Sequence, residues 1–389
     1  MLPFLSKHEI THKKVLLRVD FNVSLNADES IADDTRIQQA LPTIKLLLKN
    51  QNKIIIVSHL GEPKKRDSLY SLKRVAKDLG KYLPSYHIHL VDDFMKDTKI
   101  FVEQKQHEIL LLENIRFYPG EKANDPIFAK ELASLADVYV NDAFGVSHRK
   151  DASIVSIPQF LPHYAGLLIE KEITMLDKVI HHPEKPVVAI LGGSKVSTKI
   201  ELITKLLQLA DSVLIGGGMA NTFLAAQQFS LGKSFYEPQA VSFAKQLLTM
   251  TYAKKTKVVL PQDCVVQGKT IHETSVKDVK ADESIMDIGS ETQAIFGQHI
   301  ATAKTIIWNG PVGKFEDPAF SRGTEFIYYA ITQNPNVLSV VGGGDTLAAM
   351  KNKDYRENIT HISTGGGAML EYIEKGTLPG IEALIRDKR

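Results

Sequence analysis

Short apolar runs alternate with amphipathic segments through the first 150 residues of the chain. The apolar runs are KVLLRVDFN (14–22), KIIIVSHLG (53–61), EILLLENIRF (108–117) and DVYVNDAFG (137–145). Between them, residues 33–50 and 71–83 carry apolar side chains at helical spacing. Nearly continuous runs of Ile, Val and Leu are typical of strands buried on both faces, and strands that alternate with helices form parallel sheets. The pattern therefore predicts a doubly wound α/β domain.

The second half of the chain repeats this rhythm, but its strands end differently. The later apolar runs are PVVAILGG (186–193), DSVLIGGG (211–218), KVVLPQD (257–263), TIIWNGPVG (305–313), VLSVVGGGD (337–345) and ITHISTGGG (359–367). The early runs end in Asp, Asn, His and Arg, whereas the later ones end mainly in glycine. Ligands of open parallel sheets bind outside the carboxyl ends of the strands. We therefore predict two Rossmann-like domains, each a doubly wound parallel sheet, that bind different ligands.

The segment between the two halves has the pattern of a hinge helix. Residues 163–180 (HYAGLLIEKEITMLDKVI) carry apolar side chains at helical spacing. The pattern stops before Pro183 and Pro186, which cannot continue a helix. The chain has no short-period repeat and no low-complexity tract, which argues against a solenoid or a disordered protein.

Size, charge and cysteine content narrow the class of protein. A chain of 389 residues exceeds the length at which one hydrophobic core stops growing, so two domains are expected. Its 47 basic and 45 acidic side chains give a formal net charge of +2, which provides no overall field to attract nucleic acid or a membrane. The single cysteine, Cys264, and the lack of a signal-like or membrane-spanning apolar run predict a cytoplasmic protein.

Glycine clusters after the later strands indicate a nucleotide. Glycine lets the backbone approach a phosphate closely, and the N–H groups at a helix start bind anions. The clusters are Gly192–Gly193, Gly216–Gly218, Gly342–Gly344 and Gly365–Gly367. Asp345 follows one of them at an expected helix start, where it either caps the helix or holds Mg²⁺ beside phosphates. Glu316 either reaches ribose hydroxyls or faces solvent.

Basic side chains follow the early strands. Those at or just past the strand ends are Arg18, Arg36, His59, Arg116, His148 and Arg149, joined by Asp20 and Asn22. The planar guanidinium group of arginine matches carboxylate and phosphate oxygens, so their convergence on one sheet edge indicates a small molecule bearing both groups. The run Lys64–Arg66 is expected to be a solvated charged loop instead.

Taken together, these stretches resemble the phosphoglycerate kinase family. They occur in order over nearly the whole chain. The matching stretches are RVDFN (18–22), DDTRI (33–37), SHLGEP (58–63), ENIRFYPGE (113–121), NDAFGVSHR (141–149), AGLLIEKE (165–172), GGSKVSTKI (192–200), IGGGMANTF (215–223), NGPVGKFE (309–316), GGGDT (342–346) and STGGGAMLE (363–371).

The resemblance implies a monomeric two-domain enzyme. Its reaction is reversible phosphoryl transfer between ATP, bound with Mg²⁺, and the carboxylate of 3-phosphoglycerate, giving 1,3-bisphosphoglycerate and ADP in glycolysis and gluconeogenesis. It implies a triose domain over residues 1–163, a linker helix over 164–182 and a nucleotide domain over 183–368. Residues 369–389 are expected to pack back on the first domain.

The resemblance also assigns site residues. The triose is expected to bind Asp20, Asn22, Arg36, His59, Gly61, Arg116 and Arg149. The nucleotide is expected to bind Gly193, Lys199, Gly217, Gly289, Glu316, Gly343, Gly344, Asp345 and Thr346, with Asp345 on the metal. Arg36, Lys195 and Lys199 are the expected catalytic residues.

Lys195 and Lys199 stand four positions apart in the stretch VVAILGGSKVSTKIELI (187–203), which lacks the Walker pattern of a P-loop. That spacing places both on one face of the first turn of an expected helix, so both ammonium groups can point at the same phosphates. By resemblance, Lys195 stabilises the transferring group and Lys199 holds the nucleotide phosphates.

Two residues depart from the family pattern. Glu62 stands where the family usually has arginine, which weakens triose binding unless Lys64 or Lys65 compensates, and Thr198 stands where an aspartate is usual.

Two other classes of function stay open. A NAD-dependent dehydrogenase is the first alternative, although its G-x-G-x-x-G fingerprint is absent after the first strand. A non-catalytic nucleotide-binding or adhesion module is the second.

Overall fold

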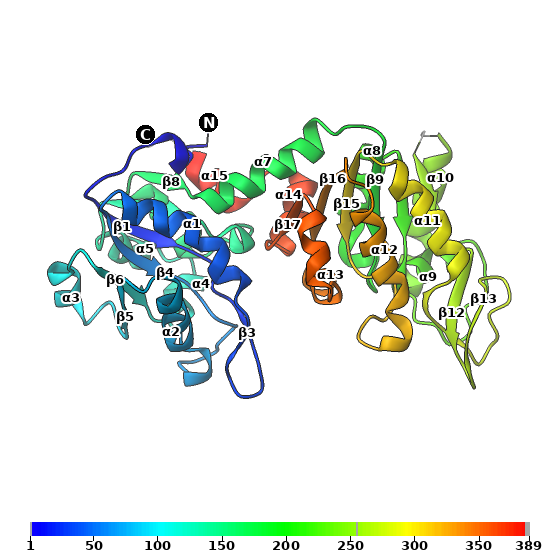
Figure 1. Ribbon diagram of the computed structural model, residues 1–389, viewed down its shortest axis with the longest axis horizontal. Helices are drawn as coiled ribbons and strands as arrows, with labels where there is room; N and C mark the ends of the chain where they lie inside the picture. The colour runs from blue at the N-terminus through cyan, green and yellow to red at the C-terminus, as the bar shows by residue number, and fades with distance from the viewer. Residues whose placement is uncertain (1, 254–255, 386–389) are drawn as a thin grey trace. The chain divides into compact units, whose positions relative to one another are not determined.

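A computed structural model describes residues 2–253 and 256–385 of the chain (Figure 1). The chain divides into two compact units. Unit 1 comprises residues 1–174 and 375–389, and unit 2 comprises residues 175–374. The two α/β units with parallel sheets confirm the predicted fold class.

Unit 1 is built on a six-stranded parallel sheet in the order β5-β6-β4-β1-β7-β8. Its strands are β1 (Lys14–Arg18), β4 (Lys53–Val57), β5 (His87–Val91), β6 (Glu108–Leu112), β7 (Val138–Asn141) and β8 (His163–Ala165). Its helices are α1 (Thr35–Lys49), α2 (Lys73–Tyr82), α3 (Thr98–Glu103), α4 (Pro119–Lys122), α5 (Pro126–Ala133), α6 (Ala152–Val155) and α15 (Pro379–Ile385), with a hairpin of β2 (Ser24–Leu25) and β3 (Ile31–Asp33). The chain leaves β1 toward β4 on one side and later adds β7 on the other, so the topology switches direction beside β1.

The core of unit 1 forms because the predicted apolar runs pair with one another in register. Leu16 lies between Ile55 and Tyr139, and Leu17 between Ile56 and Val140, all of them fully buried. The helices pack Ile37, Ile44 and Leu79 against these strands. Burial of such side chains is the main favourable term in folding, about 1.5–3 kcal/mol for each.

Unit 2 repeats the architecture with the sheet order β11-β10-β9-β15-β16-β17. Its parallel strands are β9 (Val187–Leu191), β10 (Ser212–Ile215), β11 (Lys257–Val259), β15 (Thr305–Asn309), β16 (Leu338–Gly342) and β17 (His361–Ser363). Its helices are α8 (Ile200–Leu209), α9 (Gly217–Ala226), α10 (Val241–Ala253), α11 (Ser290–Thr302), α12 (Arg322–Thr332), α13 (Gly344–Ala349) and α14 (Gly367–Lys375). The direction switches between β9 and β15, and the core of this unit includes the fully buried Trp308.

Unit 2 also holds a small antiparallel sheet that the sequence pattern did not predict. Its order is β13-β12-β14, from Ile271–Ser275, Asp263–Gln267 and Ser284–Ile288. Asp263 anchors this sheet to α11, because its carboxylate accepts hydrogen bonds from the N–H groups of Glu291 (2.9 Å) and Thr292 (2.7 Å). The small sheet thereby becomes one wall of the cavity described below.

The expected hinge helix begins later than predicted. Residues His163–Ala165 form the edge strand β8 beside β7, and the helix α7 runs from Leu167 to His181. Asp142 fixes the start of α7, because its carboxylate accepts hydrogen bonds from Leu168 N (2.8 Å) and Ile169 N (3.3 Å). The boundary between the two units falls within α7, after Thr174.

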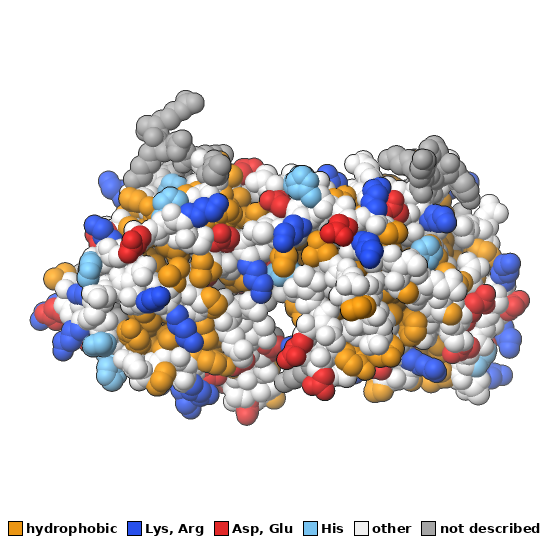
Figure 2. All heavy atoms as spheres, turned by 45° about the horizontal axis from the view of Figure 1, so that its top comes forward, with side chains coloured by type: hydrophobic (Ala, Val, Ile, Leu, Met, Phe, Trp, Pro, Cys, Tyr) orange, Lys and Arg blue, Asp and Glu red, His pale blue; other side chains and the backbone are white. Residues whose placement is uncertain are grey.

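The surface matches the near-neutral charge. On the face in Figure 2, basic and acidic side chains are interspersed over both units. Within residues 2–253 and 256–385, no helix is both long and apolar enough to cross a bilayer.

Candidate active site

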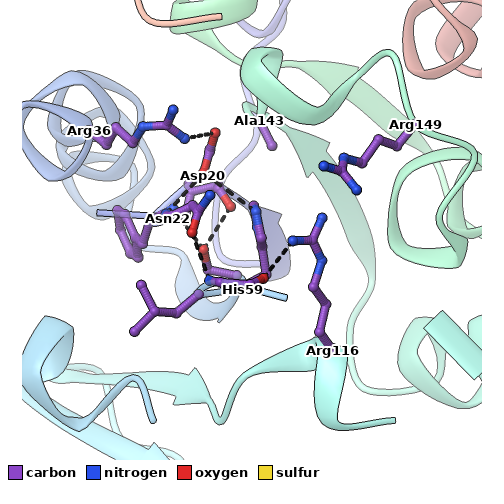
Figure 3. Close-up of polar contacts among 12 residues, drawn as sticks. Asp20, Asn22, Arg36, His59, Arg116, Ala143 and Arg149 are labelled. Atoms are coloured by element: carbon purple, nitrogen blue, oxygen red, sulfur yellow. Dashed lines mark hydrogen bonds and ion pairs between the residues drawn. The ribbon is translucent and has the colours of Figure 1, made fainter. Parts of the chain in front are cut away.

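The first cluster of predicted residues lies at the carboxyl end of β1, beside the topological switch of unit 1 (Figure 3). Arg36, from the first turn of α1, pairs with the Asp20 carboxylate. Asn22 Oδ1 accepts a hydrogen bond from Gly61 N (2.7 Å), and His59 Nε2 lies 4.0 Å from Asp20 Oδ1. Gly61 has a φ of +62°, and an added Cβ would meet the Tyr70 ring at 2.4 Å, so only glycine fits this turn.

The charges in this cluster are fixed by their surroundings. Burial alone raises the pKa of Asp20, but Arg36, His59 and the N–H of Asn22 outweigh it and lower the pKa to about 2. Burial also lowers the pKa of His59 well below its usual value, and Arg18 and Arg116 add to this effect against the opposing pull of Asp20. Asp20 is therefore a fixed anion and His59 a neutral imidazole near pH 7.

Arg116 and Arg149 extend the cluster and point toward the space around Asp20 and His59 (Figure 3). Arg116 Nη1 donates to the carbonyl of Gly61 (2.7 Å). Its Nε and Nη2 are buried and have no hydrogen-bond partner among the residues that the structure describes, and neither has the Nε of Arg149. Buried N–H groups without partners cost about 1–3 kcal/mol each, so an anion that accepted these bonds would be bound favourably.

Arg18 takes a different place from the one its position in the sequence suggested. Its side chain is fully buried, and Nε donates to Ser153 Oγ (2.8 Å) while Nη2 lies 3.4 Å from His59 Nδ1. Arg18 therefore contacts His59 from the buried side and is not available to a ligand. His148, in the loop of Arg149, is half-buried.

Glu62, the first departure from the family pattern, lies among these cations. Its Oε1 is 2.8 Å from Arg116 Nη1 and 3.0 Å from Arg149 Nη1, and its Oε2 pairs with Lys122. Burial alone raises the pKa of Glu62, but Lys122, Arg116 and Arg149 reverse this and lower it. The lysine beside Glu62 is thus Lys122, and not Lys64 or Lys65 as expected.

The second cluster lies in unit 2, where the turns after β9, β10 and β15 meet at the topological switch. Gly193 N donates to the carbonyl of Pro311 (2.8 Å), and Gly217 N to the carbonyl of Val312 (2.9 Å). Gly217 has a φ of +64°, and an added Cβ would lie 2.8 Å from the carbonyl oxygen of Gly193. A side chain larger than hydrogen does not fit at Gly217, so the turn after β10 presents bare backbone there.

Lys199 is anchored at this switch. Its Nζ donates to the carbonyl of Gly192 (3.0 Å) and to Asn309 Oδ1 (2.8 Å). Burial lowers the pKa of Lys199 to about 8, although Asp345 opposes the shift. This lysine is therefore held in place and is only moderately basic in the ligand-free chain.

The expected placement of Lys195 and Lys199 on one helical turn is wrong. Lys195 lies in the exposed loop after β9, and Lys199 ends a single 3₁₀ turn, Ser197–Lys199, that precedes α8. Glu237 holds that turn, because its carboxylate accepts bonds from Val196 N (2.5 Å) and Ser197 N (3.0 Å). Glycine-rich turns before the helix favour this arrangement over an early helix start. Thr198 Oγ1, at the second departure from the family pattern, donates to the carbonyl of Lys195 (3.4 Å).

A cavity of about 480 Å³ opens beside these turns. The predicted residues Gly193, Gly217, Glu316 and Asp345 line it, together with apolar groups of Leu224, Phe235, Met286 and Val312. Its size and mostly apolar wall with a few polar groups suit a small organic ligand. Lys199 lies beside the lining residue Gly193, and Gly289 and Gly344 adjoin the lining residues Ile288 and Asp345 in sequence. Gly343 lies beside Asn309 and Thr346 instead, outside the lining.

Asp345 and Thr346, which follow Gly344, differ in exposure to solvent. Asp345 is exposed in the first turn of α13, whereas Thr346 is buried. The Thr346 hydroxyl accepts from Gly310 N (2.7 Å) and donates to the carbonyl of Gly342 (3.1 Å). Thr346 therefore ties two strand ends together, while the Asp345 carboxylate faces the cavity.

Comparisons with known proteins agree on one family. A family model described as phosphoglycerate kinase matches residues 5–376. A phosphoglycerate kinase from Dictyoglomus turgidum is 46% identical, with 99% of this chain and 98% of the relative covered. The chain belongs to the phosphoglycerate kinase family.

Solved structures support the same conclusion. The phosphoglycerate kinase from Coxiella burnetii has a TM-score of 0.90 and 37% identity, covering 99% of each chain. The phosphoglycerate kinase from Pyrococcus horikoshii OT3 has a TM-score of 0.86 and 32% identity, covering 99% of this chain and 98% of its own. Membership of the phosphoglycerate kinase family thus holds for the fold and for the sequence.

Several residues at the two clusters were missed in the sequence analysis. Asn309 lies in a quoted phosphoglycerate kinase stretch, but its bonds to Lys199 and to the carbonyl of Gly342 (2.7 Å) were not foreseen. A signal existed, since Asn309 ends a buried strand. No signal identified Glu237 or Lys122, which reach their partners from 40 and 60 positions away.

Proposed function

We propose that this chain catalyses reversible phosphoryl transfer between ATP and the carboxylate of 3-phosphoglycerate, a step of glycolysis and gluconeogenesis. The reaction follows from membership of the phosphoglycerate kinase family over residues 5–376. The assignment of the two substrate sites rests on one observation, which is that the two units present different kinds of binding groups. Unit 1 presents arginines with buried N–H donors that have no hydrogen-bond partner among the described residues, and unit 2 presents glycine turns beside a cavity.

The triose is assigned to the cluster of unit 1. The guanidinium groups of Arg116 and Arg149 offer buried N–H donors to an anion, and Arg36 adds a third positive group. Asp20 and Asn22 supply acceptors for the substrate hydroxyl, and His59 supplies a neutral ring. This combination fits a small molecule that carries a carboxylate, a phosphate and a hydroxyl group.

The nucleotide is assigned to the cavity of unit 2, with its base against the apolar wall and its phosphates at the glycine turns. Phosphoryl transfer passes through a loose transition state whose charge is spread over equatorial oxygens, so positioned positive groups lower the barrier. Lys199, held by Gly192 and Asn309, binds ground-state phosphates. Lys195, exposed in the loop, is free to follow the transferring group.

Asp345 fits the part of a metal ligand. Mg²⁺ is commonly bound through one or two carboxylates together with substrate phosphates. The Asp345 carboxylate is exposed and lines the cavity wall, and its charge opposes the burial-driven fall in the pKa of Lys199. When bound, Mg²⁺ neutralises phosphate charge, and Asp345 holds it beside the glycine turns.

A coupled assay with ATP, Mg²⁺ and 3-phosphoglycerate tests the reaction directly. Formation of ADP that depends on 3-phosphoglycerate supports the proposal. Intact ATP binding without turnover would favour a non-catalytic nucleotide-binding module instead. Tight binding of NADH in a fluorescence titration would favour a NAD-dependent dehydrogenase.

Replacing Arg116 with alanine is expected to raise KM for 3-phosphoglycerate by about tenfold, because it removes charge-assisted hydrogen bonds to an anion. KM for ATP should change less than twofold, since the nucleotide is assigned to the other unit. Steady-state kinetics measure both values. Arg66→Ala is the matched control, because Arg66 is an exposed arginine paired with Asp92 in the same unit. Equal losses for both substrates would contradict the assignment of ligands to units.

Because the two substrates are assigned to different units, we expect the units to close on each other when both substrates are bound. Such a change would also exclude water, which hydrolyses acyl phosphates. The hinge is assigned to α7 and to residues 363–367. We expect a smaller radius of gyration in small-angle scattering when both ligands are bound, and an equal radius with and without ligands would contradict this.

A cytoplasmic location and a monomeric state complete the proposal. The one cysteine, Cys264, is a buried free thiol, which suits a reducing compartment. The substrates are small molecules, so neither nucleic acid nor a membrane is assigned as a partner. Sedimentation at working concentration measures the oligomeric state.

A further inference from the structure

Glu62 is held at the basic cluster of unit 1 by the loop that follows β4. The backbone of the preceding residue, Gly61, is fixed on both sides, because its N–H donates to Asn22 Oδ1 (2.7 Å) and its carbonyl accepts from Arg116 Nη1 (2.7 Å). The side chain of Glu62 therefore starts beside the arginines. It is 49% exposed, so it can leave the cluster for solvent without any change in the core.

The Glu62 carboxylate brings together three cations from three segments. Arg116 lies in the turn Ile115–Phe117, Lys122 ends α4, and Arg149 follows the turn Phe144–Val146. One carboxylate oxygen lies 2.8 Å from Arg116 Nη1 and 3.0 Å from Arg149 Nη1, and the other pairs with Lys122. Arg116 also has Asp151 Oδ2 at 3.7 Å from its Nη2, but Glu62 is the anion that all three cations share. Without Glu62 the three cations would repel one another more strongly.

Two of these cations are the ones assigned to the substrate. Arg116 and Arg149 are proposed to bind the anionic groups of the triose, and a carboxylate makes the same N–H···O bonds whether it belongs to the ligand or to Glu62. Glu62 takes Nη1 of both arginines, whereas the buried Nε and Nη2 of Arg116 and Nε of Arg149 have no hydrogen-bond partner among the described residues. Each guanidinium group carries a single positive charge, so the substrate anion and Glu62 compete for the same two charges.

We propose that Glu62 is an internal counter-anion of the triose site, which occupies Arg116 and Arg149 in the free chain and is displaced when 3-phosphoglycerate binds. This inference rests on the proposed function of the cluster. Its consequence is selectivity, because a ligand must offer more than one well-placed negative group to displace the carboxylate. A second consequence is that Glu62 stabilises the ligand-free chain at the expense of substrate affinity.

The test is the affinity of the full chain for 3-phosphoglycerate, measured by isothermal titration calorimetry without nucleotide. Glu62→Gln keeps the shape of the side chain and removes its charge, so Kd should fall about 3- to 5-fold, the upper end of what a half-exposed ion pair contributes. Glu29→Gln is the matched control. Glu29 is 57% exposed and paired with Arg74 in the same unit, and its loss should change Kd less than twofold.

A thermal measurement gives a second readout. Glu62→Gln should lower the Tm of the ligand-free chain, because the three cations lose their shared partner, and 3-phosphoglycerate should raise its Tm more than it raises that of the wild type. If Kd rises or stays unchanged in Glu62→Gln, Glu62 is not a competitor, and the proposal is overturned.

Arg116→Ala in the same titration separates this inference from the proposed function. An unchanged Kd in Arg116→Ala would mean that the triose does not bind at the cluster at all. A weaker Kd in Arg116→Ala without tightening in Glu62→Gln would leave the site assignment intact and remove only the role of Glu62.

Discussion

Replacing Lys195 with alanine is expected to lower kcat by a factor of about 10²–10³, equivalent to roughly 3–4 kcal/mol, the usual cost of losing one positioned group that stabilises transition-state charge. KM for both substrates should change little, because the charge that Lys195 meets develops only as the phosphoryl group leaves ATP. Steady-state kinetics with each substrate varied in turn measure the three constants. Lys195 is exposed, so its loss should hardly alter folding.

Lys245→Ala is the matched control for this experiment. Lys245 is an exposed lysine on α10 of the same unit, and its replacement makes the same change of charge away from the glycine turns. Its kcat should equal that of the wild type. A wild-type kcat in Lys195→Ala would show that Lys195 is a solvated loop residue, and the proposed mechanism would lose its main catalytic group.

Replacing Lys199 with alanine is expected to act on ATP binding instead. KM for ATP should rise about 10- to 100-fold, which corresponds to the loss of charge-assisted hydrogen bonds worth about 1.5–3 kcal/mol. The fall in kcat should be smaller than the rise in KM. The change also leaves Asn309 Oδ1 and the carbonyl of Gly192 without the ammonium donor, so Tm should fall.

The pH dependence of ATP affinity distinguishes this role from a purely structural one. Because the pKa of Lys199 is lowered to about 8, the charged form dominates below pH 8 and the neutral form above it. ATP affinity should therefore weaken between pH 7 and pH 9 in calorimetric titrations. Lys199→Arg keeps a permanent positive charge and should lose most of this dependence. A wild-type pH profile in Lys199→Ala would contradict the assignment.

Most of the parallel strands were predictable because they are buried apolar runs, and β5 and β8, which escaped prediction, lie at the two edges of the sheet of unit 1. β5 alternates exposed and half-buried side chains from His87 to Leu90, and of its five residues Val91 alone is buried, so it has no long apolar run. β8 has three residues, two of them half-buried. Its apolar residues continue the helical spacing of the residues that follow, so the whole segment was predicted as one helix. The sheet of β12–β14 has an antiparallel pattern that a search for parallel units does not detect.

The site was predictable where a residue follows a strand and not where the contact depends on side-chain reach. Asp20, His59 and Gly193 all lie directly after strands, so the parallel topology gathers them. The pairing of Glu62 with Lys122 joins positions 60 apart, and the sequence around either residue does not predict it. The order of turn and helix around Lys195 likewise depended on Glu237, a distant residue that binds the turn.

The helix α15 makes unit 1 discontinuous in the chain, and this affects how the protein emerges from the ribosome. Ile381 and Leu384 of α15 are buried, α15 packs on α6, and Gly380 N donates to the carbonyl of Ser147 (2.8 Å). Unit 2 is continuous over residues 175–374, so it is the first to have all its residues available, although its synthesis starts second. At about 5–20 residues per second, the first 174 residues wait on the order of 10–40 s for the segment that covers α6. During that interval Ile154 lacks Gly380, which lies against it in the folded chain.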